Sequence, residues 1–197
     1  MINVAIIGIG AIAPSHIEAF QSFKDRCNIV ALCDIYPEKA KRGAEKYSLD
    51  VDIYDDHKKM LAREDIDLVA VCTPPYTHAE ISINFLNAGK HVICEKPMAS
   101  SLEECDAMNA AAEKSGKILS IISQNRFVSS MMKLKHVLDT ELIGTVVHAQ
   151  VDSFWWRGHS YYDLWWRGTW EQEGGGPTLN HAVHHIDIFR WMNGMPS

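Results

Sequence analysis

A glycine-rich turn near the start of the chain has the spacing of a dinucleotide-binding site. Residues 8–13, GIGAIA, match the pattern G-x-G-x-x-[GA]. Gly8 permits a tight turn, Gly10 lets the backbone approach a pyrophosphate, and Ala13 is small enough for a following helix to pack on the strand. The N-terminus of that helix offers N–H groups and a partial positive charge to phosphates. The residues predicted to bind a dinucleotide here are Gly8, Gly10, Ile12 and Ala13.

An acidic residue further along the chain indicates which dinucleotide would bind. Asp34 follows Gly10 by 24 positions, near the ~20 typical of this fingerprint, and ends a predicted strand. A carboxylate there accepts hydrogen bonds from an adenosine ribose and repels a 2′-phosphate, which favours NAD over NADP. Lys39 and Arg42 are close enough in sequence to keep NADP as the less favoured alternative, and Asp34 could instead be a solvated turn residue.

Alternating strands and helices are predicted to position these residues. Apolar runs rich in Ile and Val alternate with amphipathic stretches, which is typical of parallel β/α units. Strands are predicted at residues 3–7, 29–34, 68–72, 91–94 and 118–122, and helices at 14–23, 37–47, 57–62, 77–88 and 102–114. Pro37 suits a helix start, Gly116 suits a helix end, and Ser100 or Ser101 could cap the last helix. The pattern predicts an α/β fold, a doubly wound parallel sheet of Rossmann type over residues 1–122.

The pattern changes after about residue 122. A helix is predicted at 129–138, a strand at 145–154, an aromatic-rich segment at 155–170 and a final helix at 180–192. A single strand leaves both of its edges unpaired. We therefore expect residues 123–197 to form an incomplete α/β domain. We also expect apolar surface on the strand to be exposed unless another chain covers it.

Two segments that follow predicted strands complete the set of motifs. Thr73, Pro74 and His78 follow the strand at 68–72, and the tripeptide Glu-Lys-Pro at 95–97 follows the strand at 91–94. The carboxyl ends of parallel strands are where open α/β sheets bind ligands. Together with the glycine-rich turn, these segments resemble the Gfo/Idh/MocA family of dinucleotide-dependent oxidoreductases, which includes glucose–fructose oxidoreductase and inositol dehydrogenase.

The resemblance covers the whole chain, through the glycines at 174–176, Asn180, His184 and Asp187 to Gly194. The resemblance implies that residues 123–197 are part of an open-sheet domain that serves substrate binding and oligomerisation. Family members are considerably longer, so this second domain is expected to be cut short. Besides the glycine-rich turn and Asp34, the cofactor contacts that the resemblance implies are Thr73, Pro74, His78, Glu95, Lys96, Trp166 and Arg167.

The resemblance implies that Lys96 contacts both the nicotinamide ribose and a substrate hydroxyl. An ammonium that is partly desolvated near a bound cation can have a lowered pKa, so it can relay a proton. The alternative is a lysine paired with Glu95 at a strand end, an arrangement that is common and contributes little stability.

The resemblance also implies a catalytic role for His184. Oxidation of an alcohol by hydride transfer releases a hydroxyl proton, and an imidazole can take it near neutral pH. Asn180, four residues earlier, is expected on the same helix face as a substrate ligand. Many relatives carry aspartate there, and an amide cannot act as a base, so proton transfer is expected to depend on His184 and Lys96. Asp187 is a candidate to orient the His184 imidazole or to cap a local network.

The same region allows a metal site as an alternative. His181, His184 and His185, with Glu171 and Glu173 nearby, could hold zinc. The segment has no H-E-x-x-H pattern, however, and the adjacent His184 and His185 point to different sides of a helix. We therefore expect no metal site.

Aromatic residues are concentrated in one part of the second domain. Five of the six tryptophans lie in residues 155–170. Most are expected to pack as core against the open sheet, and one or two could stack on a sugar ring. Arg126, in the segment after the strand at 118–122, is expected to contact substrate.

Composition excludes several other classes of protein. The chain is 47% hydrophobic and 22% charged, unlike disordered sequences, and its net charge of −6 argues against binding to nucleic acid or anionic membranes. No window of ~20 residues stays apolar without charge, so no membrane span is predicted. The five cysteines form no C-x-x-C pair, and we expect reduced thiols and a cytoplasmic protein.

These observations predict an NAD-dependent oxidoreductase that transfers a hydride between a nicotinamide cofactor and a sugar, cyclitol or related polyhydroxy substrate. The full-length form is expected to be a homo-oligomer. The alternative is a dinucleotide-binding protein without turnover, or an inactive fragment of such an enzyme, and Asn180 is the residue that keeps this alternative open.

Overall fold

The computed structural model describes residues 1–194 and divides the chain into two compact units, Met1–Ile121 and Ile122–Ser197. The sequence pattern predicts a domain boundary between residues 122 and 123, and residues 195–197 of the predicted second domain lie outside the described residues. Within the described part of the chain, no helix is both long and apolar enough to cross a membrane.

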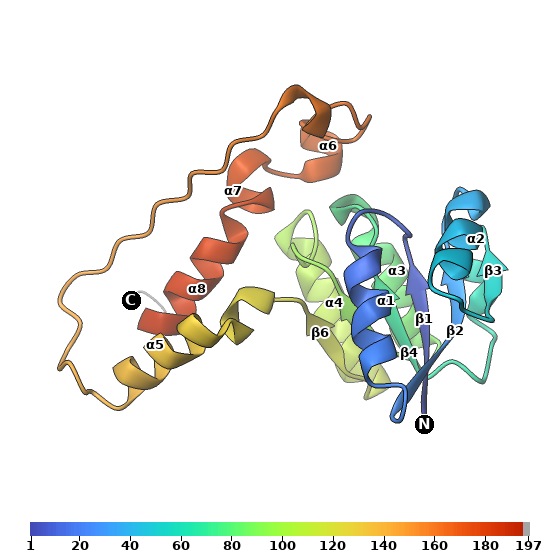
Figure 1. Ribbon diagram of the computed structural model, residues 1–197, viewed down its shortest axis with the longest axis horizontal. Helices are drawn as coiled ribbons and strands as arrows, with labels where there is room; N and C mark the ends of the chain where they lie inside the picture. Colours follow the sequence, from blue (N-terminus) through green and yellow to red (C-terminus); the bar gives the residue numbers. More distant parts are fainter. Residues whose placement is uncertain (195–197) are drawn as a thin grey trace. The chain divides into compact units, whose positions relative to one another are not determined.

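The first unit contains a parallel sheet of six strands in the order β3-β2-β1-β4-β5-β6 (Figure 1). This is the strand order of the doubly wound Rossmann fold, which confirms the predicted fold class. The order reverses between β1 and β4, so the carboxyl ends of these two strands mark the place where such sheets bind ligands. The strands are β1 (Ile2–Ile7), β2 (Cys27–Cys33), β3 (Asp52–Tyr54), β4 (Leu68–Val71), β5 (His91–Cys94) and β6 (Leu119–Ile121).

Helices cover both faces of this sheet, because alternate residues of each strand point to opposite sides. Val4 and Ile6 of β1 pack with Ile17 in one apolar cluster. Ile7 packs with Phe85 in a second cluster. The helices of the unit are α1 (Ala13–Ser22), α2 (Pro37–Lys46), α3 (His78–Asn87) and α4 (Leu102–Ser115), with the short 3-10 helices η1 (His57–Met60) and η2 (Pro75–Thr77).

Most predicted helix ends of the first unit are confirmed. Pro37 is the first residue of α2. The Ser101 hydroxyl caps α4 by accepting a hydrogen bond from the Glu104 N–H, and Gly116 ends α4 in the left-handed conformation at φ 65°. The helix predicted at 57–62 is instead the 3-10 helix η1, which the Asp56 side chain caps.

All five cysteines of the chain are free thiols. Burial raises the pKa of Cys33 to about 12, with a further contribution from the neighbouring Asp34. Burial likewise raises the pKa of Cys94 to about 12. These two thiols therefore stay protonated at neutral pH and act as small apolar core residues.

The prediction of a strand at residues 145–154, in the second unit, is wrong. Residues 145–158 contain neither helix nor strand. A strand requires a neighbour to satisfy its backbone N–H and C=O groups, and none pairs with this segment within the described residues. The apolar surface expected there is exposed, with Val147 at 96% and Phe154 at 88%. The unit's helices are η3 (Gln124–Phe127), α5 (Ser129–Asp139), η4 (His159–Tyr161), α6 (Trp170–Glu173), α7 (Gly176–Asn180) and α8 (Val183–Asn193).

The single helix predicted at 180–192 is divided in two. The backbone N–H groups of His181 and Ala182 both donate to the Pro177 carbonyl at 2.9 Å, which closes α7 before α8 begins. Asn180 therefore ends one helix, while His184 lies in the next, so the shared helix face expected for them is not formed.

The tryptophans were expected to form core, and this expectation is also wrong for most of them. Trp156 is 90% exposed and Trp170 is 78% exposed, and Trp155 and Trp165 are exposed by more than half. The sheet that would have covered them is not formed by the described residues of this unit.

Candidate functional site

The glycine-rich turn joins β1 to α1 at the switch point of the sheet. Gly8 has φ 88°, and its N–H donates to the Cys33 carbonyl at 2.8 Å. A β-carbon added to Gly8 would lie 2.8 Å from the backbone of Cys72 and Thr73. Packing between the ends of β1 and β4 therefore requires glycine at this position.

Nothing in the described protein requires glycine at position 10. A β-carbon added to Gly10 would meet no atom within 4 Å. The following helix α1 begins at Ala13, which is fully buried, and its N-cap residue, Ile12, makes no side-chain capping bond. Open space beside an uncapped helix N-terminus is what a pyrophosphate needs, so these residues fit a dinucleotide.

Asp34 lies at the end of β2 and reaches back to the glycine-rich turn. Its Oδ2 accepts the backbone N–H of Ile9 at 2.8 Å, and its Oδ1 accepts the N–H of Tyr36 at 2.9 Å. The residue is only 8% exposed, so it is not a solvated turn residue. Each carboxylate oxygen has a second lone pair, so the fixed Asp34 side chain retains capacity to accept a ribose hydroxyl.

The end of β5 carries the Glu-Lys-Pro tripeptide. Glu95 is buried, and its Oε1 lies 2.9 Å from Nε2 of His16 in α1, while its Oε2 accepts the Lys96 N–H at 3.2 Å. Burial alone would raise the pKa of the Glu95 carboxyl, but the hydrogen bond and charge of His16, together with the N–H and charge of Lys96, lower it below 4.5. The carboxylate is therefore held ionised beside Lys96.

His78, at the start of α3, differs from its expected role. It is fully buried, with Nδ1 2.8 Å from the Pro97 carbonyl oxygen and Nε2 2.8 Å from the Thr73 carbonyl oxygen. A side chain with no accessible surface cannot touch a bound dinucleotide, so the direct cofactor contact predicted from the sequence is corrected. The ring instead lies between the segments that follow β4 and β5.

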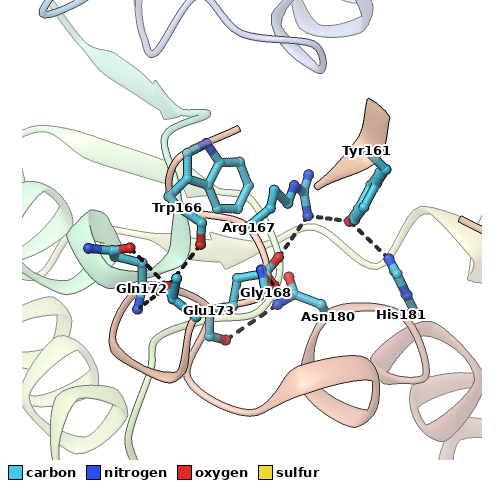
Figure 2. A network of polar contacts seen from close by, with 9 residues as sticks. Tyr161, Trp166, Arg167, Gly168, Gln172, Glu173, Asn180 and His181 are labelled. Carbon is cyan, nitrogen blue, oxygen red and sulfur yellow. Dashed lines mark hydrogen bonds and ion pairs between the residues drawn. The ribbon is translucent and has the colours of Figure 1, made fainter. Parts of the chain in front are cut away.

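In the second unit, polar contacts gather around the buried Glu173 (Figure 2). Its Oε1 accepts Nη1 of Arg167 at 3.0 Å, and its Oε2 accepts the Gly168 N–H at 2.7 Å. The Arg167 guanidinium also contacts the Tyr161 hydroxyl, which lies 2.9 Å from Nε2 of His181. This network fixes the segment before the glycines at 174–176.

The Arg167 guanidinium also stacks on aromatic rings. Its Cζ lies 4.0 Å from the ring centroid of Trp166 and 4.3 Å from that of Tyr161. Cation–π contacts of this kind fix the plane of a guanidinium. The side chains of Trp166 and Arg167, which the sequence predicts as cofactor contacts, are thus held together as one group.

A cavity of about 190 Å³ lies next to this network. Asn180 lines it, is buried, and donates its Nδ2 hydrogen bond to the Glu173 carbonyl at 3.4 Å. The lining residues are Tyr161, Tyr162, Gly168, Thr169, Trp170, Glu173, Gly176, Pro177, Asn180 and His181.

Asp187 has a different partner from the one expected. The carboxylate forms a two-pronged ion pair with Arg126, in which Nε of Arg126 donates to Oδ2 at 2.8 Å and Nη2 donates to Oδ1. This hydrogen bonding raises the pKa of the Arg126 guanidinium. His184 is buried in α8, with its ring edge-on to Trp155 at 6.3 Å between centroids. Asp187 thus orients Arg126.

Among the described residues, no three or more His, Cys, Asp or Glu side chains are grouped so that they could hold a metal ion. Glu173, considered above as a zinc ligand, is bound by Arg167 and Gly168.

Comparison with known protein families identifies the first unit. Residues 2–123 match the oxidoreductase family with an NAD-binding Rossmann fold, GFO_IDH_MocA. The chain belongs to the Gfo/Idh/MocA oxidoreductase family. Residues 131–197 match the GFO/IDH/MocA C-terminal domain. The first unit is thus this family's NAD-binding Rossmann domain, in agreement with the predicted cofactor.

Named relatives of this Gfo/Idh/MocA chain are dehydrogenases. D-glucoside 3-dehydrogenase of Escherichia coli is 30% identical over all of this chain and 55% of its own length. Inositol 2-dehydrogenase of Gluconacetobacter diazotrophicus is 34% identical over 97% of this chain and 54% of its own length. The WlbA dehydrogenase of Chromobacterium violaceum, solved with NADH and UDP-GlcNAcA, is 36% identical, with a TM-score of 0.91 over 98% of this chain and 55% of its own. The chain spans about half the length of these relatives.

The contacts of three residues in the candidate site were not predicted from the sequence. His16 follows Ala13 by three positions, and a histidine in the first turns of this helix could have been noticed as a side chain directed toward the strand ends. Glu173 and Tyr161 gave no spacing signal, because their partners are set by the folding of an irregular segment.

Proposed function

We propose that this chain acts as an NAD-dependent oxidoreductase that transfers a hydride between a nicotinamide cofactor and a CH–OH group of a sugar, cyclitol or related polyhydroxy compound. The observation that carries the proposal is the empty space at Gly10, beside the uncapped N-terminus of α1. The named relatives, which include an inositol and a glucoside dehydrogenase, support the substrate class.

Binding is proposed to begin in the first unit. The N–H groups at the start of α1 and the backbone at Gly8 and Gly10 would hold the pyrophosphate, and Asp34 would accept hydrogen bonds from the adenosine ribose. The fixed negative charge of Asp34 disfavours a 2′-phosphate, so NAD binds in preference to NADP. Other proposed cofactor contacts are Ile12, Thr73, Pro74, Glu95, Lys96, Trp166 and Arg167. Ala13, predicted as a cofactor contact from the sequence, is fully buried and instead lets α1 pack closely on the sheet.

We propose that Lys96 and His184 take part in transfer of the substrate hydroxyl proton. The bound nicotinamide supplies the hydride chemistry. Lys96 contacts the substrate hydroxyl and the nicotinamide ribose, and His184 takes the hydroxyl proton as the hydride leaves carbon. Asn180 orients the substrate, and Arg126, whose guanidinium Asp187 fixes, adds a further substrate contact. We also propose that a second copy of the chain covers exposed apolar residues such as Val147 and Phe154, which would make the protein a homo-oligomer.

Calorimetric titration with NAD and, separately, NADP tests the binding step. Selective binding of NAD supports the proposal, and binding of neither refutes it. A screen of sugars and cyclitols, monitored by nicotinamide absorbance, then tests turnover. Binding without turnover of any polyol would favour a dinucleotide-binding protein that has no catalytic activity.

A further inference from the structure

Lys96 lies between two residues that histidine side chains contact, one histidine partly buried and the other fully buried. Before it in sequence, Glu95 contacts His16 of α1, with 2.9 Å between Oε1 and Nε2. After it, Pro97 places its carbonyl oxygen 2.8 Å from Nδ1 of His78. The His16 side chain is 11% exposed and His78 is fully buried, so water has little access to these contacts.

The same two histidines reach the parts of the unit that would face a dinucleotide. His16 belongs to α1, the helix whose uncapped N-terminus follows the open space at Gly10. The second ring nitrogen of His78 lies 2.8 Å from the carbonyl oxygen of Thr73, the residue that packs against Gly8. The segments after β1, β4 and β5 are thereby connected through two imidazole rings.

We propose that His16, acting through Glu95, and His78, acting through Pro97, are positioning residues for Lys96. This rests on the proposed function, in which Lys96 contacts the nicotinamide ribose and the substrate hydroxyl. A dinucleotide bound at the start of α1 fixes His16, which fixes the Glu95 carboxylate beside the lysine. Such support matters because a misplacement of about 1 Å can cost about 100-fold in rate.

His57 provides a matched control within the same unit. Its side chain is 14% exposed, close to that of His16, and its Nδ1 lies 3.5 Å from an Asp56 carboxylate oxygen. Its Nε2 lies 3.2 Å from Nδ2 of Asn84, and its ring packs against that of Phe85. None of these contacts involves residues 95–97. Replacing His57 therefore removes a comparable histidine–carboxylate contact without changing the neighbours of Lys96.

The test follows Lys96 itself in the ligand-free chain. Reductive methylation with ¹³C-formaldehyde labels the lysines, and Lys96→Arg identifies the Lys96 signal. His16→Leu and His78→Phe should shift and broaden this signal, because the flanking residues are no longer held. His16→Gln, which keeps an N–H donor toward Glu95, should restore it, and His57→Leu should leave it unchanged.

NAD titration of the same variants tests the connection to the cofactor. His16→Leu should weaken NAD binding about tenfold, the lower end of the ~10–100-fold loss seen when an outer-shell partner of a metal site is removed, and His16→Gln should recover most of the loss. An unchanged Lys96 signal in folded His16→Leu and His78→Phe would overturn the inference, as would failure of the Gln variant to restore it. Failure of the unaltered chain to bind NAD would instead refute the proposed function, while the ligand-free Lys96 signal would still decide the positioning roles.

Discussion

Gly8 and Thr73 approach each other so closely that a β-carbon on Gly8 would lie 2.8 Å from the Thr73 backbone nitrogen. The first residue belongs to the turn after β1 and the second follows β4, so this contact joins the two strand ends at which the order of the sheet reverses. Gly10, two residues away, has no such neighbour within 4 Å. The two glycines of one fingerprint therefore serve different purposes, packing in one case and access for a ligand in the other.

Alanine substitutions at Gly8 and Gly10 should distinguish the packing role of the first glycine from the ligand-access role of the second. Gly8→Ala should destabilise the first unit by about 1–3 kcal/mol, because it combines a strained positive φ with a backbone clash. Gly10→Ala should change stability by less than about 0.5 kcal/mol but abolish NAD binding, because its methyl group occupies the space for the pyrophosphate. Urea unfolding followed by far-UV circular dichroism, with calorimetric NAD titration, measures both effects.

Each glycine variant is the control for the other. Normal stability in Gly8→Ala would contradict the packing argument. Tight NAD binding by folded Gly10→Ala would contradict the assignment of the open space to a cofactor.

The sequence was sufficient to predict the Rossmann unit, because its determinants are local. Apolar runs, helix caps such as Ser101 and the glycine-rich turn each depend on a few neighbouring residues. The sequence separation between Gly10 and Asp34 was enough to predict that residues after two different strands belong to one site, because a β-α-β unit fixes that separation. The edge strand β3 was missed since three residues, Asp52–Tyr54, give no periodic pattern.

The errors concern properties that depend on distant partners. Residues 145–154 have the apolar content of a strand, but a strand forms only where another strand pairs with it. Asp187 pairs with Arg126 across 61 positions, and no sequence period encodes that distance. His78 was correctly placed after β4, but its complete burial results from tertiary packing against the residues after β5.

Substitutions of Asp34 should change cofactor selectivity. Asp34→Ser should weaken NAD binding about tenfold, because it removes a charged acceptor for the ribose. The same substitution should reduce the difference in binding affinity between NAD and NADP. Asp34→Asn keeps the shape and an acceptor oxygen for the Ile9 N–H but loses the charge, so it should retain more NAD affinity while also losing selectivity. Parallel calorimetric titrations with NAD and NADP measure the dissociation constant of each dinucleotide. If NADP affinity is unchanged in both variants, the Asp34 carboxylate does not exclude the 2′-phosphate.

The stability of the first unit should depend on pH through His78. Burial lowers the pKa of this imidazole from 6.5, despite the opposing effect of the two backbone contacts. The unfolded chain therefore binds more protons below pH 6.5, so the stability contribution is complete above that pH and declines as pH falls toward the lowered value. Urea unfolding followed by circular dichroism between pH 8 and 5 should show this decline. Burial also lowers the pKa of His57, so His57 contributes to the same decline.

His78→Gln isolates the contribution of that ring. Glutamine does not titrate in this range and can donate to one of the two carbonyl oxygens, so the variant should show a shallower decline than the unaltered chain. Identical slopes in the two proteins would mean that His78 is not responsible.

The two glutamates of α6 allow a matched test in the second unit, where all six tryptophans of the chain lie. Glu173 is buried and binds Arg167 and Gly168, whereas Glu171 is exposed on the same short helix. Glu173→Gln should destabilise this unit by about 1–3 kcal/mol, because it removes the charge that pairs a half-buried guanidinium. Glu171→Gln should change stability by less than about 0.5 kcal/mol. Tryptophan fluorescence during urea unfolding reports on this unit alone, so equal midpoints for the two variants would show that the Glu173 network does not stabilise it.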